Sequence, residues 1–183
     1  MKKTIIKYTF LALIIFIPQE FIFAQTSIKS SDFAEDFLPR WQRAKDYTLE
    51  VAEAMPEHDY DFKPMEDVDS FRGQLGHLIG NFSFLQSFIS ETKENPLKGI
   101  NLEGKSKKEV KEEIVKAFDF IADLAKNTPD HEITKKIQFF RSEVLMTKGG
   151  IFYLIRDHVT HHRAEMIVYL RLKGIKPPKY VGW

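Results

Sequence analysis

The sequence of 183 residues contains no cysteine, and its charges nearly cancel, with 27 Lys and Arg against 26 Asp and Glu. The absence of cysteine excludes disulfide bonds, thiolate metal ligands and a cysteine nucleophile. A net charge of +1 without a basic run is also unlike the electrostatic surface with which proteins bind nucleic acid. We therefore expect no nucleic-acid partner and a fold that depends on its hydrophobic core.

Long apolar runs are missing too, except near the N-terminus. Three lysines precede the apolar stretch Tyr8–Ile17, and Ala24 offers a small residue for cleavage. These features are typical of a secretory signal peptide. A retained membrane anchor is the alternative, but a span needs about 20 apolar residues, and Gln19 and Glu20 interrupt this run. We expect residues 1–24 to be removed, the mature chain to be periplasmic or extracellular, and no stable membrane anchor to remain.

The rest of the chain carries the periodicity of amphipathic helices. Four segments repeat apolar residues every three or four positions, namely residues 32–54, 70–91, 106–127 and 151–173. Ser106 and Glu109 form a capping box before the third segment, and Gly174 ends the fourth. Residues 129–147 are predicted to be extended or partly helical, without a convincing alternating strand pair. We predict that residues 25–183 form a single all-α domain, a four-helix bundle.

Three of the six histidines fall within five positions of the last predicted helix. His158 and His162 are four residues apart, so they lie about 40° from each other on its apolar side. His161 flanks that side and is expected to meet solvent or a neighbouring loop. Two neutral imidazoles at this spacing can bind one metal ion at about 2.0–2.1 Å, but they do not complete a site.

A third ligand must come from another helix, and His77 is the candidate. It is predicted to face inward from segment 70–91, where neighbouring glycines would leave space beside it. The alternative is that the histidines are hydrogen-bonded core residues, which is the commoner role of a single buried histidine. Burying three imidazoles without partners is costly, and a shared metal ion would remove that cost.

Two segments resemble the motifs of the DinB/YfiT-like superfamily. The stretch HVTHHRAEMIVYLRLKGIKPPKY is similar to its C-terminal pattern, H-x-x-x-H-R-G-Q followed by an apolar helix and a short proline-containing tail. The stretch SFRGQLGHLIGNFSFL is similar to its second-helix motif, which carries one histidine. The resemblance implies a four-helix bundle, often a homodimer, with a divalent metal held by His77, His158 and His162. Zinc, nickel and manganese are all plausible metals.

The sequence departs from the family pattern at Ala164, where glycine is usual, and at Glu165, where glutamine is usual. Glu165 lies about 20° from His158 around the predicted helix, on the side away from His162. Three roles follow for this carboxylate: a fourth ligand, a general base, or an acceptor for an imidazole N–H. A surface glutamate that pairs with His161 at the i, i+4 spacing is equally compatible with the sequence.

The sequence is compatible with three functions. The resemblance implies a metal-dependent transferase that activates a low-molecular-weight thiol, or a hydrolase that activates water, acting on an unidentified small-molecule substrate. Export weighs against the thiol version, because the exported compartment is oxidising. The second function is metal binding without turnover, in stress response or metal handling. The third is an interaction bundle that keeps its histidines as core residues.

Overall fold

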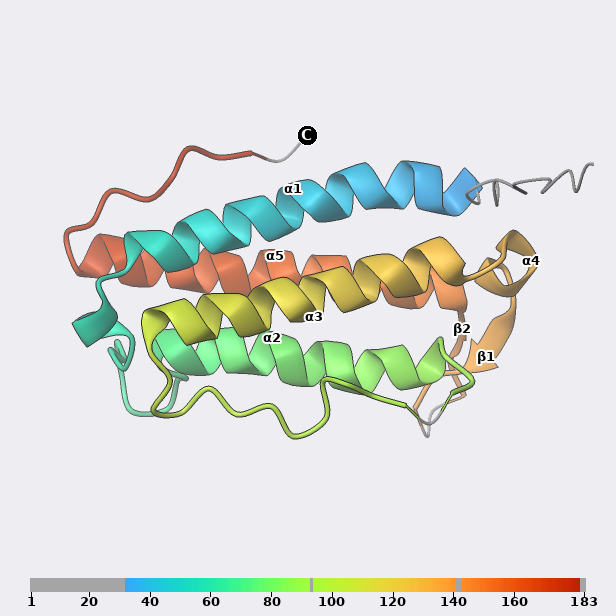
Figure 1. Ribbon diagram of the computed structural model, residues 1–183, viewed down its shortest axis with the longest axis horizontal. Coiled ribbons are helices and arrows are strands. Elements are labelled where there is room, and N and C mark those ends of the chain that lie inside the picture. The colour runs from blue at the N-terminus through green and yellow to red at the C-terminus, as the bar shows by residue number, and fades with distance from the viewer. Residues whose placement is uncertain (1–31, 93, 141–142, 182–183) are drawn as a thin grey trace, which may run out of the picture.

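The computed structural model describes residues 32–92, 94–140 and 143–181, so the predicted signal peptide lies outside the described residues (Figure 1). Four long helices run side by side: α1 (Asp32–Ala54), α2 (Phe71–Leu85), α3 (Lys107–Asn127) and α5 (Lys148–Leu172). Each packs against two others, in the cyclic order α1, α3, α2, α5. The prediction of an all-α four-helix bundle is confirmed. Among the described residues, no helix is both long and apolar enough to cross a membrane.

Hydroxyl side chains set the starts of three bundle helices. The side chain of Ser70 accepts a hydrogen bond from the Gly73 N–H at the start of α2. The predicted capping box of Ser106 and Glu109 is present at the start of α3. Thr147 accepts from the Gly150 N–H, and α5 therefore begins earlier than the apolar pattern indicated. Such side chains satisfy N–H groups that the first helical turn leaves unpaired.

Short elements connect the long helices. They are the 3₁₀ turns η1 (Glu57–Asp59) and η2 (Gln86–Phe88), the single-turn helix α4 (Asp130–Ile133), and the strands β1 (Lys136–Gln138) and β2 (Leu145–Thr147). The described residues between 129 and 147 are thus partly helical and partly extended, as predicted. The two strands pair antiparallel, and this pairing was not predicted. Strands of three residues are too short to display an alternating pattern. α2 also ends before the predicted limit, because η2 tightens the chain after Leu85.

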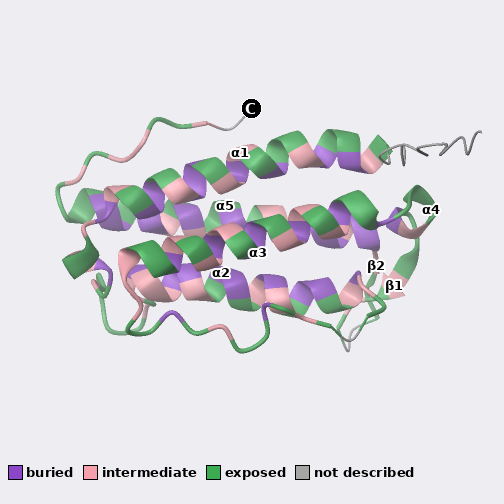
Figure 2. Cartoon of the chain, in the orientation of Figure 1, coloured by how far each residue is buried: buried purple, intermediate pink, exposed green. Residues whose placement is uncertain are grey.

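The core is centred on aromatic rings contributed by three helices. Trp41 of α1 stacks on Phe118 of α3 at 4.6 Å between ring centroids, and it contacts Phe82 of α2 at 5.4 Å. Its indole N–H donates to the Phe118 carbonyl oxygen at 2.8 Å, which satisfies the one polar atom that this side chain buries. Figure 2 shows the same organisation along the helices, with buried residues on the inner faces and exposed residues outside.

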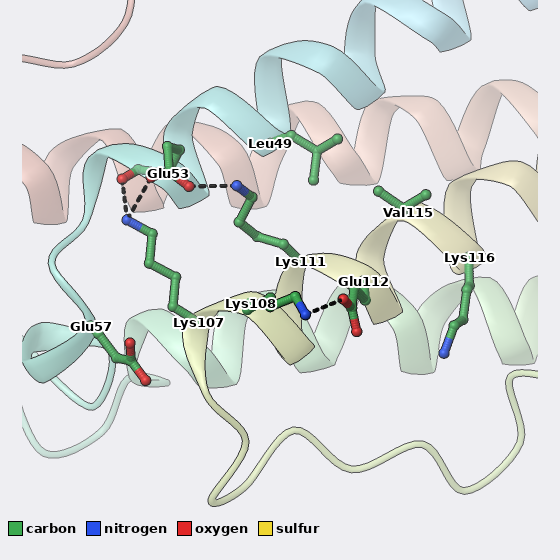
Figure 3. A pocket seen from close by; sticks show the side chains of 9 residues that line it. All are labelled: Leu49, Glu53, Glu57, Lys107, Lys108, Lys111, Glu112, Val115 and Lys116. Atoms are coloured by element: carbon green, nitrogen blue, oxygen red, sulfur yellow. Dashed lines mark hydrogen bonds and ion pairs between the residues drawn. The ribbon is translucent and has the colours of Figure 1, made fainter.

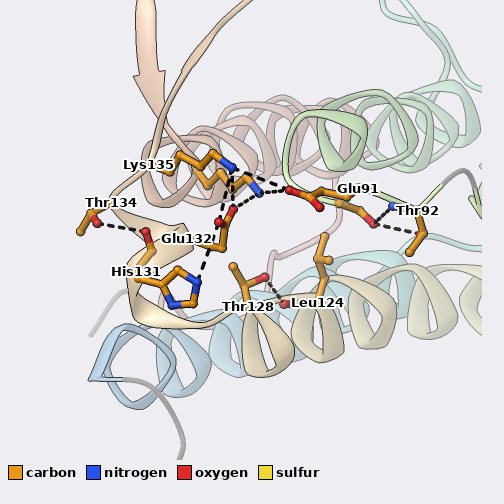
Figure 4. A network of polar contacts seen from close by, with 10 residues as sticks. Glu91, Thr92, Leu124, Thr128, His131, Glu132, Thr134 and Lys135 are labelled. Carbon is orange, nitrogen blue, oxygen red and sulfur yellow. Dashed lines mark hydrogen bonds and ion pairs between the residues drawn. The ribbon is translucent and has the colours of Figure 1, made fainter.

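An ion-pair network ties the short elements to the start of α5. The Lys148 side chain is only 6% exposed, and its ammonium lies 2.5 Å from a Glu132 carboxylate oxygen and 3.9 Å from a Glu91 carboxylate oxygen. Lys135 contacts the same two glutamates (Figure 4). A buried ammonium needs such partners, because desolvation of an unpaired charge is costly. The hydrogen bond from Lys148 lowers the pKa of the Glu132 carboxyl below its ordinary value.

Glu132→Gln tests this network through its pH dependence. Because the pKa of Glu132 in the folded state lies below the ordinary 4.5, the pair stabilises the fold above about pH 4.5 and its contribution is lost at lower pH. The variant should have a lower Tm than the wild type at pH 7, and the difference should shrink at pH 3. Thermal unfolding followed by circular dichroism measures both values.

The control is Glu50→Gln, which removes an exposed carboxylate of α1. It should change the Tm equally little at the two pH values. A Glu132→Gln effect that is the same at pH 3 and pH 7 would contradict a stabilising ion pair.

Candidate metal centre

The packing of α2 against α5 brings three histidines together from positions far apart in the sequence. One ring nitrogen each from His77, His158 and His162 lies within 4.8 Å of the other two. The ring centroid of His77 lies 5.1 Å from that of His158 and 4.5 Å from that of His162. The ring centroids of His158 and His162 are 4.3 Å apart. His158 and His162 occupy successive turns of α5, as their spacing predicts.

The cluster lies at the edge of the bundle rather than in its core. His158 and His162 are partly buried, but His77 is exposed. The prediction that His77 faces inward is therefore wrong. At 100° per residue, it lies about 130° from the middle of the stripe formed by Phe71, Leu75, Leu78 and Phe82. The cluster thus has a buried side on α5 and an open side on α2.

The glycines of α2 do not create space for His77 either. A methyl group placed on Gly80 would meet no atom within 4 Å, and one on Gly76 would lie 3.8 Å from the nearest Leu102 atom, in ordinary contact. The glycine pattern near His77 is accordingly not explained by an inward-facing imidazole. The exposed side of α2 simply presents small residues around the histidine.

A buried glutamine holds His162. Gln74 is 3% exposed, and its Oε1 lies 2.5 Å from His162 Nδ1. A neutral imidazole that donates from Nδ1 to this oxygen keeps the lone pair of Nε2 available for a metal. Burial, more than any charge, lowers the pKa of His162 to about 4, so the imidazole is neutral near pH 7.

Gln74 of α2 makes two further hydrogen bonds to α5. Its Nε2 donates to Glu165 Oε2 at 2.6 Å and to the Tyr169 hydroxyl at 3.2 Å. The Tyr169 hydroxyl donates in turn to the Asp69 carbonyl oxygen at 2.9 Å, just before α2 begins. This buried amide therefore has partners for both its N–H donors and its carbonyl oxygen. Sequence reasoning missed Gln74, although a polar residue on the apolar stripe three positions before His77 was a visible signal.

Glu165 and His161 form a pair beside the cluster. His161 Nε2 lies 3.0 Å from Glu165 Oε1, and His161 is exposed as its position on the helix predicts. The other oxygen of Glu165 accepts from Gln74, so both oxygens are engaged. Of the roles considered for this carboxylate, pairing with His161 matches the observed contacts directly. Glu165 Oε2 also lies 3.8 Å from His162 Nδ1, and Gln74 bridges the two residues through hydrogen bonds.

His158 supplies the clearest sign that a ligand belongs here. Its Nε2 is buried and has no hydrogen-bond partner within the part of the chain that the structure describes. Burial, followed by the neighbouring His162 and His77, lowers the pKa of His158 to about 4. Its ring is therefore neutral near pH 7, as metal ligation requires. A buried nitrogen with a free lone pair costs free energy unless a donor or a cation satisfies it.

The dimensions of the cluster fit one ion after small side-chain movements. Two nitrogens bound to one ion at about 2.0–2.1 Å lie at most about 4.2 Å apart, and the three nitrogens of the cluster all lie within 4.8 Å of one another. The exposed His77 can adjust to this spacing by a change of side-chain torsion angle. Three neutral nitrogen donors also suit the borderline-soft divalent metals.

Comparisons with known proteins agree with this architecture. Residues 29–182 match the sequence profile of the DinB family. The protein YjoA of Bacillus subtilis (strain 168) is 25% identical over 132 residues, which cover 71% of this chain and 84% of YjoA.

Solved structures are similar in fold. A DinB-like protein from Bacillus cereus ATCC 10987 superposes with a TM-score of 0.66 at 17% identity, covering 80% of this chain and 97% of that one. The crystal structure of YjoA superposes with a TM-score of 0.65 at 17% identity, covering 79% of this chain and 96% of YjoA. A putative member of the DinB family from Exiguobacterium sibiricum superposes with a TM-score of 0.62 at 13% identity, covering 84% of this chain and 99% of that one.

The family match spans most of the chain, including both histidine-bearing helices. The resemblance inferred from the two histidine motifs is thereby confirmed. This protein belongs to the DinB family.

Proposed function

We propose that this protein binds one divalent metal ion through His77, His158 and His162. The observation that carries the proposal is the convergence of three ring nitrogens within 4.8 Å, one of which, His158 Nε2, is buried without a partner. Hydrogen-bonded core histidines, the alternative, would not leave that nitrogen unsatisfied. Zinc, nickel and manganese are the candidate metals.

Gln74 and Glu165 act in this proposal as positioning residues. A metal-binding histidine commonly donates its second N–H to an acceptor that orients the ring. Gln74 Oε1 offers that acceptor to His162, and Glu165 holds the Gln74 amide in place through Nε2. Because both Glu165 oxygens are already engaged, by His161 and by Gln74, we favour this role over a fourth ligand or a general base.

Access from solvent supports a reactive or ligand-binding centre over a closed structural one. The open side of the cluster is formed by His77, which is exposed. Three protein ligands leave a position for an exogenous group, as in catalytic zinc sites. A bound divalent metal acts as a Lewis acid and lowers the pKa of a thiol or water that reaches it. This supports a metal-dependent transferase or hydrolase, with non-catalytic metal binding as the second candidate.

Export and self-association remain parts of the proposal. The N-terminal pattern of residues 1–24 predicts a periplasmic or extracellular protein, and the family resemblance favours a homodimer. In an oxidising compartment, low-molecular-weight thiols are less available, which favours the hydrolytic version of the activity.

Metal analysis of the purified protein tests the binding site directly. Elemental analysis should find about one divalent ion per chain, and His158→Ala should reduce this below roughly one tenth, because two remaining imidazoles do not make a stable site. His161→Ala is the matched control, since it removes a neighbouring histidine outside the cluster of three. Failure of the wild type to take up zinc, nickel or manganese would refute the proposal, and so would equal losses in the two variants.

Gln74→Leu tests the positioning role. The substitution removes the acceptor for His162 Nδ1 and should weaken metal affinity by about 10- to 100-fold, the usual cost of losing such a partner. Tyr169→Phe is the control, because it removes a hydroxyl that contacts Gln74 but leaves the His162 contact. Competition with a fluorescent chelator measures affinity, and circular dichroism checks that each variant is folded. Equal affinities for Gln74→Leu and wild type would show that Gln74 does not orient the ligand.

Substitution with cobalt(II) tests access to the site. If an exchangeable position faces solvent beside His77, adding 2-mercaptoethanol or azide should change the visible absorption of the cobalt-loaded protein in a saturable way. The same additions to cobalt-loaded His161→Ala should give the same change. A spectrum that neither reagent alters would indicate a closed site and favour a structural or storage role.

A further inference from the structure

A second polar site lies between α1, α5 and the C-terminal tail. A cavity of about 490 Å³ is lined there by Arg40, Arg43, Arg156 and Arg163, with Tyr180 of the tail on one side. The tail runs back beside α1 in Figure 1, and the rings of Tyr47 and Tyr180 contact each other at 6.3 Å. Asp157 is the one carboxylate among the residues lining the cavity.

Arg163 is a buried cation whose partners are all neutral. It is 7% exposed, and its Nη1 donates to the Ala44 carbonyl oxygen at 3.3 Å and to the Thr48 hydroxyl at 3.4 Å. Its Nη2 donates to the Thr160 hydroxyl at 3.5 Å, and the guanidinium lies 4.7 Å from the Tyr47 ring centroid. The two Nη1 bonds tie α5 to α1, the Thr160 bond stays within α5, and all three are long. No carboxylate pairs with Arg163 among the described residues, although buried charges normally have a counterion.

The hydrogen bonds within the protein leave some donors of Arg163 unused. A guanidinium has five N–H groups in a planar fork, and the contacts above occupy three of them. Arg43 lines the same cavity, and in the described part of the chain it has no ion-pair partner. Arg40 and Arg156 are each paired with a neighbouring carboxylate, Asp36 and Asp157. Two uncompensated guanidinium groups therefore share one cavity.

A second cavity is also lined by basic side chains, but there they are paired with carboxylates. It has a volume of about 630 Å³ and lies between α1 and α3 (Figure 3). Lys107 and Lys111 both pair with Glu53, and Lys108 pairs with Glu112. Glutamates of the same surface thus neutralise these three lysines. The arginine-lined cavity lacks this compensation at Arg43 and Arg163.

The arginine-lined cavity is separate from the histidine cluster. At 100° per residue, Arg156, Thr160 and Arg163 lie about 150° around α5 from His158 and His162. α5 thus presents the histidines toward α2 and the arginines toward α1, and its own backbone lies between the two sites.

We propose that the arginine-lined cavity binds an oxyanion, the carboxylate or phosphate head group of a small organic molecule. The planar fork of arginine matches both head groups through paired N–H donors. The cavity volume falls in the range of small-molecule sites, about 300–1,000 Å³, so it accommodates more than a bare ion. The Tyr180 ring offers an apolar wall for the rest of such a molecule.

Phenyl phosphate and benzoate are the probes, since they share a ring and differ only in the head group. Isothermal titration calorimetry of the full-length protein should show saturable binding of at least one probe. The probe that binds more tightly identifies the preferred head group. Arg43→Gln should weaken that binding about tenfold or more, the effect of losing one charge-assisted pair. Arg171→Gln is the matched control, because it removes the same charge from an exposed position of α5 outside the cavity.

The proposal is overturned if neither probe binds saturably, or if Arg43→Gln and Arg171→Gln weaken binding equally, which would indicate general charge attraction. Metal content is measured in the same samples and should not change in Arg43→Gln. Loss of oxyanion binding with intact metal content is therefore distinguishable from any failure of the metal site.

Discussion

The candidate metal centre depends on the contact that Gln74 makes between α2 and α5. This buried amide joins His162, Glu165 and Tyr169 of α5 to the helix that carries His77. Tyr169 extends the connection to the Asp69 carbonyl before α2. Because a buried amide must satisfy its polar atoms, any sliding of α2 along α5 would leave several of these groups unpaired. The same contact therefore fixes both the helix register and the orientation of a candidate metal ligand.

The position of the cluster at the edge of the bundle links packing to chemistry. The aromatic core around Trp41 fills the interior, so the polar groups of the two candidate sites lie at the seams between helices. At the seam with α2, α5 carries two neutral imidazoles. At the seam with α1, it carries a buried guanidinium, Arg163. One helix thus carries two proposed sites of opposite chemical preference, one for a cation and one for an anion, on faces about 150° apart.

Local patterns accounted for most of the fold, and they failed where contacts between distant segments decide the outcome. The bounds of α1 and the capping box at Ser106 follow from neighbouring residues, and both were predicted well. The hairpin of β1 and β2 was missed, because three-residue strands carry almost no periodic signal. The exposure of His77 was predicted wrongly. Its position about 130° from the buried stripe follows from helix geometry, and the packing of α2 against α5 then places its exposed ring beside His158 and His162.

The sequence by itself determined the helical class, the caps and the spacing of His158 and His162, because these depend on residues within a few positions of one another. Only the tertiary structure decided that His77 meets this pair from the open side, that Gln74 holds His162, and that Glu165 turns to His161 and Gln74. It also decided that Arg163 is buried beside three other arginines. The physical reason is that helix packing sets each of these contacts, and packing is a property of the whole chain.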